Sequence, residues 1–293
     1  MASTLAQLVV DGLGMGLVYV LLASGINLII AISGILFIAY GQFYMLGAYI
    51  LWGLVVLLKV PFFISLCVAA VVPAMLGGVI YRLIFQRIQS MQRQFLNGIV
   101  ASIGLMVLIG QAALLAFGTS SRGVPPVFTG MLNVGVVSIS FDKVVLIMLA
   151  IVVLLGLHFL LQKTNVGRAM RAVSFNPDVA ALQGVNSSRI YLGAMVVGCA
   201  LAGFAGGAMS PMFGVSPQMG MTTLLVLLVV VLGGIGSMTG AIIAGLILGL
   251  TLSFGQYFIS GGLAQIFFFI VIGLIIFFRP GGLLGQPAEE MPL

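Results

Sequence analysis

The spacing of the charged residues is the feature that most constrains this fold. No Asp, Glu, Lys or Arg interrupts the 47 residues between Asp11 and Lys59, and the longest such gap runs for 89 residues between Arg189 and Arg279. A helix needs about 20 apolar residues to cross the hydrocarbon core of a bilayer. By that length the first gap holds two spans, the last holds three or four, and three shorter gaps between them hold one each.

The total is eight or nine crossings, and the composition agrees with lipid as the surrounding solvent. Hydrophobic residues make up 62% of the chain and charged residues only 5%, whereas an ordinary soluble domain is about half apolar and about a quarter charged. Continuous apolar runs favour helices over the alternating, roughly ten-residue strands of a membrane barrel. We therefore expect an all-α, polytopic membrane helical bundle that forms a single transmembrane domain over residues 1–293.

The basic residues indicate the orientation of the chain. The formal charge of +6 is not gathered on a soluble basic domain, so nucleic acid is not an expected partner. Lys and Arg cluster instead in two loops, at residues 82–93 and 163–189, and the positive-inside rule places such loops in the cytoplasm. Three spans precede the first loop, so we expect the N-terminus outside. Nine crossings then bring Arg279 and the C-terminus inside.

Patterns typical of catalysis and of metal binding are absent from the sequence. His158 is the single histidine, and there is no HExxH motif and no nucleophile beside a base, so we expect no catalytic or metal-ligating residues. Without a GxxxxGK[ST] loop the chain cannot hydrolyse ATP by Walker-type chemistry, and we expect no cofactor in it. A proton-coupled carrier usually has a carboxylate at depth, whereas sodium coupling through backbone carbonyls stays open. The acidic residues all fall at span ends or in loops: Asp11, Asp142, Asp178, Glu289 and Glu290.

Glycine is abundant, with 40 residues. We interpret most of them as packing residues, because glycines four residues apart let helix backbones approach closely. Such pairs are Gly12 with Gly16, Gly203 with Gly207, Gly236 with Gly240 and Gly245 with Gly249.

Two glycine-rich clusters, at residues 33–42 and 233–240, each interrupt a run that otherwise continues as helix. Paired interruptions in the two halves of a transporter point to broken helices that line a central pathway, and to a possible inverted repeat. Tight turns between ordinary spans are the alternative. The candidate pathway residues are Tyr40, Gly41, Gln42, Gly233, Gly234, Gly236 and Ser237.

The loop that follows the fourth expected span contains an alternating stretch from Val134 to Phe141. Such alternation predicts a short hairpin at the external surface. A loose surface loop is the alternative.

The second basic loop contains a complete set of helix-boundary signals. Asn176 is a good N-cap, Pro177 suits the first helical position, Asp178 complements the positive helix end, and Gly184 can terminate the helix. We predict a short helix from Pro177 to about residue 183. Two turns are too short to be stable alone, so the helix must pack on something, and its small apolar residues suit a groove on a partner: Ala180, Ala181 and Leu182. A solvated basic loop that serves only topology is the alternative.

This loop resembles the cytoplasmic coupling segment of the branched-chain amino-acid ABC transporter permeases, the Liv type. Their pattern is G-R-x-x-R-A, a few residues, N-P or D-P, two alanines, and G-I or G-V-N. Residues 24–28, 44–49 and 233–241 resemble the same family, so the likeness covers nearly the whole chain. Phe37 and Tyr40 stand where the family pattern N-F-A-H-G has Asn and His. The coupling residues that the resemblance implies are Gly167, Arg168, Arg171, Ala172, Asn176, Pro177, Ala180, Ala181 and Gly184.

The resemblance also implies partners and a location. The chain looks like the shorter of two permeases, and the family implies a longer second permease, two ATP-binding subunits that hydrolyse ATP, and an extracytoplasmic substrate-binding protein. The implied site is the bacterial cytoplasmic (inner) membrane.

The expected function is therefore half of a pathway for branched-chain or other small neutral amino acids. The alternatives are a permease for urea, short amides or sugars, and an ion-coupled secondary carrier that works alone. A membrane scaffold without transport activity leaves the glycine-rich breaks and the capped loop helix unexplained.

Overall fold

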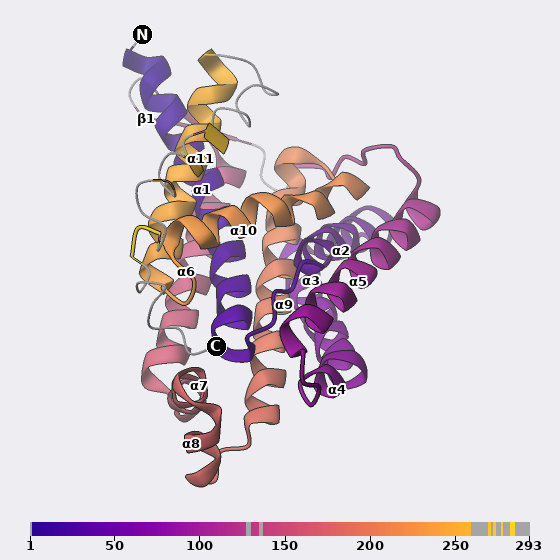
Figure 1. Ribbon diagram of the computed structural model, residues 1–293. Coiled ribbons are helices and arrows are strands. Elements are labelled where there is room, and N and C mark those ends of the chain that lie inside the picture. Colours follow the sequence, from indigo (N-terminus) through magenta and orange to yellow (C-terminus); the bar gives the residue numbers. More distant parts are fainter. Residues whose placement is uncertain are drawn as a thin grey trace. The chain divides into compact units, whose positions relative to one another are not determined.

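The computed structural model describes residues 2–126, 130–134, 137–258, 269–270, 272–273, 277 and 282–284 (Figure 1). Within these residues it is almost wholly helical, which confirms the predicted all-α class. Seven helical stretches are long and apolar enough to cross a membrane, judged by length and composition. They are Thr4–Ser33, Tyr40–Leu57, Phe62–Ile88, Gln94–Phe117, Phe141–Lys163, Ser187–Phe213 and Met238–Phe258.

The first five of these stretches cover the charge-free gaps as expected, two over the first gap and one over each of the next three, and three of them extend past the charged residues that border their gaps. The last gap contains two of the seven and a shorter apolar helical segment, Pro217–Gly233. The span expected near the C-terminus falls mostly outside the described residues. The total of eight or nine crossings therefore stays a prediction.

The spans are built from regular helices with a few local changes of winding. The α-helices are α1 (Ala2–Ser33), α2 (Tyr40–Trp52), α3 (Phe62–Ile80), α4 (Gln86–Ile88), α5 (Gln94–Phe117), α6 (Phe141–Lys163), α7 (Asn165–Phe175), α8 (Pro177–Leu182), α9 (Ser187–Phe213), α10 (Thr222–Gly233) and α11 (Met238–Phe258). Two π-helical turns, η1 (Gly53–Leu57) and η2 (Tyr81–Phe85), extend α2 and α3, and a 3-10 segment, η3 (Pro217–Met221), precedes α10.

The expected hairpin is present. Strands β1 (Met131–Val134) and β2 (Val137–Ser140) pair antiparallel, with Met131 opposite Ser140 and Val134 opposite Val137. The alternating stretch read from the sequence supplies the second strand and the end of the first. This pairing confirms the hairpin over the loose loop.

The described residues form two compact units. Unit 1 comprises residues 1–27, 126–151 and 225–293, and unit 2 comprises residues 28–125 and 152–224. The expectation that the whole chain is a single domain stays a prediction.

The core of unit 2 is the contact among α2, α3 and α9. A methyl group built on Gly47 of α2 would overlap the backbone of Gly203 in α9, and one on Gly206 would overlap the Tyr44 carbonyl. On its other side, Gly203 lies against the Ala69 carbonyl of α3. These positions hold backbone against backbone, which confirms the packing role predicted for Gly203.

Unit 1 uses the same device between α1 and α11. Gly16 faces the backbone of Leu246, and Gly249 lies directly against Gly16. Gly12 and Gly245 make equally close contacts, with Leu250 and Val20 respectively. The predicted packing role of both glycine pairs is confirmed.

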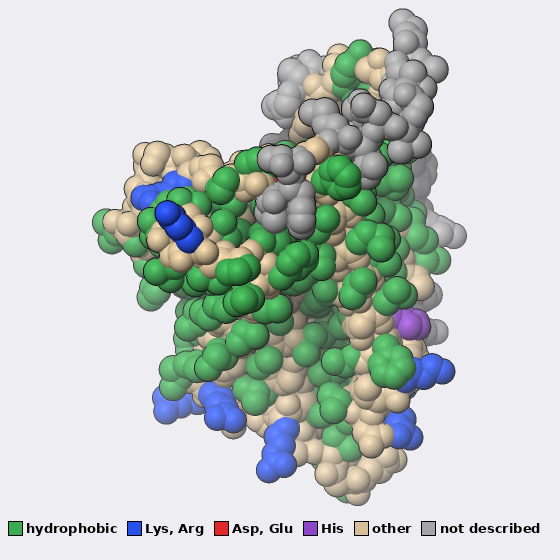
Figure 2. All heavy atoms as spheres, turned by 180° about the vertical axis from the view of Figure 1, so that it is seen from behind, with side chains coloured by type: hydrophobic (Ala, Val, Ile, Leu, Met, Phe, Trp, Pro, Cys, Tyr) green, Lys and Arg blue, Asp and Glu red, His purple; other side chains and the backbone are tan. Residues whose placement is uncertain are grey.

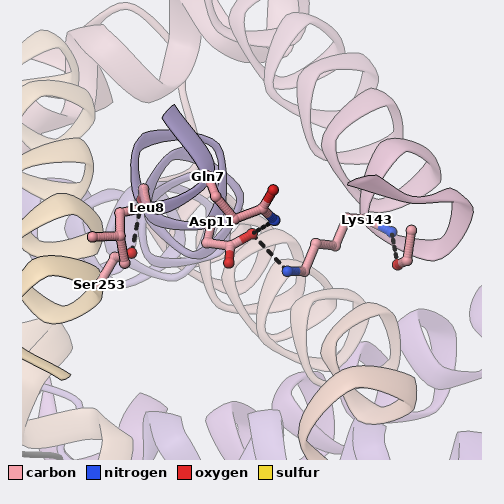
Figure 3. Close-up of polar contacts among 6 residues, drawn as sticks. Gln7, Leu8, Asp11, Lys143 and Ser253 are labelled. Carbon is pink, nitrogen blue, oxygen red and sulfur yellow. Dashed lines mark hydrogen bonds and ion pairs between the residues drawn. The ribbon is translucent and has the colours of Figure 1, made fainter. Parts of the chain in front are cut away.

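Polar contacts join the same unit at the N-terminal end of α1 (Figure 3). Lys143 Nζ of α6 lies 2.6 Å from Asp11 Oδ1, and Gln7 Nε2 donates to the same oxygen at 3.3 Å. The Ser253 hydroxyl of α11 donates to the Leu8 carbonyl at 2.7 Å. Asp11 is thus paired within its own unit.

The outer helices present apolar side chains. Only 17% of the most apolar window of α5, and likewise of α6, is buried within the chain. Figure 2 shows a face on which hydrophobic side chains predominate and the Lys and Arg side chains lie at its margins. A broad apolar surface bordered by cations is what a membrane span presents to lipid.

The glycine contact between α2 and α9 can be tested with two substitutions in the same continuous helical stretch. Gly47→Val drives a branched side chain into the Gly203 backbone, whereas Gly53→Val meets nothing within 4 Å. We expect Gly47→Val to destabilise the chain by roughly 1–3 kcal/mol or more, since overpacking costs about that much. The unfolding temperature of each variant in detergent measures the loss of stability, with the fraction of folded protein after heating read from size-exclusion chromatography. Equal unfolding temperatures for the two variants would contradict the packing role.

Candidate functional site

The first predicted break lies between α1 and α2. Helix α1 ends at Ser33, Gly34 adopts φ +66°, and α2 begins at Tyr40 without a side-chain cap from Ala39. Two amides at this start are bonded from elsewhere in unit 2. Ala39 N donates to Ser102 Oγ of α5 at 3.0 Å, and Gly41 N donates to Thr223 Oγ1 at 2.6 Å. The interruption read from the sequence is therefore real.

The three candidate pathway residues at this break have different environments. Tyr40 is fully buried and its hydroxyl donates to the Gly198 carbonyl at 3.2 Å. A methyl group on Gly41 would overlap Thr223 Oγ1 and the Gly220 carbonyl. Tyr40 and Gly41 thus make contacts between elements of unit 2.

Gln42 differs because part of its amide is uncommitted. The side chain is 6% exposed and lies against two glycines, Gly220 of η3 and Gly110 of α5. Its Oε1 is buried and has no hydrogen-bond partner among the described residues. A buried amide oxygen without a donor is costly, and the Gln42 oxygen is the polar atom of this break whose hydrogen-bonding capacity the described residues leave unmet.

The second predicted break separates α10 from α11. Helix α10 ends at Gly233, and Gly234 and Gly236 adopt φ +98° and +86°. Such left-handed conformations favour glycine. The Ser237 hydroxyl then accepts from Gly240 N at 3.0 Å, capping the start of α11. Gly233 and Gly240 lie against each other, with no room for a side chain on either.

Asn27 of α1 holds this second break in place. Its Oδ1 accepts from Gly236 N at 2.7 Å, and its Nδ2 donates to the Ser237 carbonyl at 3.1 Å. The side chain is 2% exposed. Sequence reasoning did not assign Asn27 to the site, although an amide side chain in the middle of a long uncharged run was a usable signal, since such a group is expensive in lipid unless it is bonded.

The basic loop folds into two short helices at one end of α9 (Figure 1). Thr164 caps α7 by accepting from Gly167 N at 3.0 Å. Gly167 has no space for a side chain against the carbonyls of Leu160 and Leu161. Arg171 donates to the Leu161 carbonyl. This arginine is therefore bound to the end of α6.

Helix α8 has the predicted boundaries. Asn176 Oδ1 accepts from Asp178 N at 3.0 Å and from Val179 N at 3.1 Å, and Pro177 is the first helical residue. The helix ends at Leu182, and Gly184 adopts φ +81°. The predicted cap, start and terminator are all confirmed.

The faces of α8 are less evident from the sequence. Ala180 is 2% exposed, so its side chain packs inside this chain. Ala181 is exposed, and larger apolar side chains lie beside it in water-accessible positions. Their exposed fractions are 83% for Phe175, 51% for Val179 and 89% for Leu182. Phe175 and Val179 were not among the residues that the sequence indicated for contact.

Comparison with known proteins identifies the family. Residues 8–278 match the model of the branched-chain amino acid transport system permease component. The chain belongs to this permease family. It is 29% identical to the high-affinity branched-chain amino acid permease BraD of Pseudomonas aeruginosa, over 97% of each chain. It is 26% identical to LivM of Escherichia coli K12, over 97% of this chain and 72% of LivM.

The permease fold has a solved counterpart. The structure of PsaBC from Streptococcus pneumoniae in complex with Fab matches with a TM-score of 0.52 and 14% identity, covering 92% of this chain and 91% of that one. At this identity the likeness concerns the fold alone. The matched permease model and the seven apolar helices together make this chain a multi-pass membrane protein, and its relatives are transport subunits rather than enzymes.

The Asn27 bridge of this permease can be tested against a second amide on the same helix. Asn27→Leu leaves Gly236 N without its partner, and the Ser237 carbonyl keeps only the bond from Ala241 N at 3.0 Å. An unsatisfied buried group costs about 1–3 kcal/mol. Gln7→Leu is the matched control, because among the described residues the Gln7 side chain bonds only to Asp11, which retains Lys143. We expect a lower thermal unfolding midpoint for Asn27→Leu alone. An equal shift in both variants would show that the bridge does not hold the break.

Proposed function

We propose that this chain forms half of the transmembrane pathway of an ATP-driven importer for branched-chain or other small neutral amino acids. The family match and the relatives support the reaction class. The observation that carries the coupling to ATP is α8, a two-turn helix that is capped at its start and presents apolar side chains away from its own chain. Large apolar side chains gathered in exposed positions mark a protein interaction site.

The proposed assembly contains a longer second permease, two ATP-binding subunits and an extracytoplasmic binding protein. LivM, which extends well beyond the length that this chain covers, supports the longer permease. ATP is hydrolysed by the partner subunits, and this chain carries no cofactor and no catalytic residue. The single permease domain spans residues 1–293, with residues 163–189 as its coupling loop.

In the coupling loop we propose two roles. Asn176, Pro177 and Gly184 shape the loop by capping, starting and ending α8, and Gly167 and Arg171 hold the loop against the end of α6. Ala172 and Ala180 are the smaller packed residues of the same loop. Phe175, Val179, Ala181 and Leu182 enter a groove on an ATP-binding subunit, and Arg168 meets acidic or carbonyl groups at its edge.

For the pathway we propose that the two breaks, at residues 33–42 and 233–240, lie along the route of the substrate. Support comes from their glycine-rich, non-helical backbone and from the uncommitted oxygen of Gln42. One break lies in each half of the chain, which agrees with a possible inverted repeat in a chain of nine crossings. Gly234, Gly236 and Ser237 then line the second break, and Tyr40 and Gly41 position Gln42 at the first.

The orientation places the N-terminus outside and the C-terminus inside the bacterial cytoplasmic membrane. Single cysteines at the exposed positions Ser90 and Ser174, in a Cys67→Ala background, should react only with thiol reagents that cross the membrane, because the basic residues hold both loops inside. Lys59→Cys, an exposed control in a loop expected outside, should react with an impermeant reagent in intact cells. Labelling of Ser90→Cys or Ser174→Cys from outside would overturn this orientation.

Docking through α8 can be tested without disturbing the core of the chain. Leu182→Asp places a carboxylate where we propose a packed contact, and burying an unpaired charge costs several kcal/mol. We expect co-purification of the ATP-binding subunit and substrate-stimulated ATP hydrolysis both to fall by roughly tenfold or more. Met91→Asp, an exposed apolar residue of the other cytoplasmic loop, is the control.

The same reconstituted complex tests the function as a whole. Leucine uptake into proteoliposomes should require ATP and the binding protein together. Uptake by the chain alone under an ion gradient would instead establish a secondary carrier. Normal assembly and normal ATP hydrolysis in Leu182→Asp would contradict the docking role of α8 but not the proposed transport function.

A further inference from the structure

Arg122 lies where a basic residue is unexpected. It is the single Lys or Arg between Arg93 and Lys143, in a loop that the proposed orientation places outside, where the positive-inside rule disfavours basic residues. Its backbone is firmly placed, because Arg122 and Val215 exchange two N–H···O bonds of 2.8 Å in an antiparallel bridge. This bridge joins the segment after α5 to the segment after α9, both in unit 2.

The side chain of Arg122 lies on an aromatic cluster. Its guanidinium carbon is 4.4 Å from the ring centroid of Trp52 and 5.6 Å from that of Phe117. The Phe117 ring in turn stacks on Tyr49 of α2, with centroids 4.0 Å apart. Cations are attracted to the faces of aromatic rings at these distances. Two aromatic rings therefore hold the guanidinium, and Tyr49 supports one of them.

Most of the hydrogen-bond donors of this cluster have no acceptor among the described residues. A guanidinium has five N–H donors, and in the described residues only Nη2 is engaged, donating to the Phe117 carbonyl at 2.9 Å. No carboxylate of the described chain forms an ion pair with Arg122. Tyr49 is 3% exposed, and its hydroxyl has no partner among the described residues. The cluster thus contains a partly exposed cation and a second unmatched donor.

The acceptor that best suits such a cluster is a carboxylate. Its two oxygens and planar shape match the fork of a guanidinium, and such charge-assisted pairs are about twice as strong as neutral hydrogen bonds. An apolar amino acid brings this group together with an aliphatic side chain that can lie along the aromatic rings. Its carboxylate therefore matches the charge of Arg122, and its aliphatic side chain matches the apolar surroundings of that residue.

We propose that Arg122, with the Tyr49 hydroxyl as a second donor, binds the α-carboxylate of the transported amino acid on the external side of the permease. This inference rests on the proposed function and names the residues that recognise the charged end of the substrate. The aromatic cluster holds the guanidinium ready before the substrate arrives. Pre-organisation of this kind reduces the entropy lost when the ligand binds.

Trp52 is the single tryptophan of the chain and lies under the guanidinium, so its fluorescence reports on Arg122. The full-length chain in lipid nanodiscs is titrated with leucine, with 4-methylpentanoate, which lacks the ammonium group, and with leucinamide, which lacks the carboxylate. We expect a saturable change in Trp52 emission with the first two ligands and none with leucinamide.

Substitutions then assign the donor. Arg122→Gln should weaken leucine binding by roughly tenfold or more, since it removes a charge-assisted pair. Arg122→Lys keeps the charge but loses the forked geometry, so its leucine affinity should lie between those of the unchanged protein and Arg122→Gln. Tyr49→Phe should weaken binding less than Arg122→Gln does. The matched control is Lys59→Gln, an exposed basic residue of the other external loop, which should bind leucine like the unchanged protein.

Four results would overturn the proposal. The first two are that leucinamide binds like leucine and that Arg122→Gln behaves like Lys59→Gln. The third is that Arg122→Gln weakens association of the binding protein with the complete importer while the leucine titration is unchanged, because the carboxylate then belongs to the protein partner. A fall in unfolding temperature with unchanged leucine affinity also shows a purely structural arginine. Absence of ATP-dependent leucine uptake by the unchanged importer would refute the proposed function separately, since the nanodisc titration needs no ATP-binding subunit.

Discussion

Direct contact between helix backbones at glycine is the interaction on which the rest of unit 2 depends. Lipid offers two apolar helices no hydrophobic reason to associate, so their attraction must come from close packing and from hydrogen bonds over short distances. Gly47 and Gly206 let α2 and α9 meet backbone to backbone. That closeness lets the Tyr40 hydroxyl reach the Gly198 carbonyl of α9. The start of α2, with Gln42, is positioned as a consequence.

The breaks in the helices depend on side chains that come from distant parts of the chain. An amide that leaves a helix within the membrane finds no water, so another group must bond to it. Thr223 and Ser102 supply that group at the start of α2, and Asn27 supplies it between α10 and α11. Glycine permits the backbone to turn at these points. The hydrogen bonds from the polar side chains hold the turned backbone in position.

The two ends of unit 2 combine apolar and polar groups in different ways. At the end that contains α8, this helix is shaped by local caps and presents Phe175 and Leu182 outward. At the other end, Arg122 is held by aromatic rings and by a backbone bridge to Val215. The first arrangement suits a protein groove, which excludes water from apolar side chains. The second suits a small anion, which can accept from donors that have no acceptor in the described part of the chain.

The sequence by itself determined the features that depend on neighbours along the chain. Charge-free runs set the first five spans, Asn176, Pro177 and Gly184 set the ends of α8, and glycine clusters set the two breaks, because bilayer thickness, capping and backbone freedom all act locally. Only the tertiary structure decided which face of a helix is covered. It buried Ala180 and left Leu182 in the open, gave Asn27 the amide of Gly236 as its partner, and brought Arg122 onto Trp52. These outcomes join residues up to 209 positions apart, and no local pattern encodes which distant backbone will arrive at a given side chain.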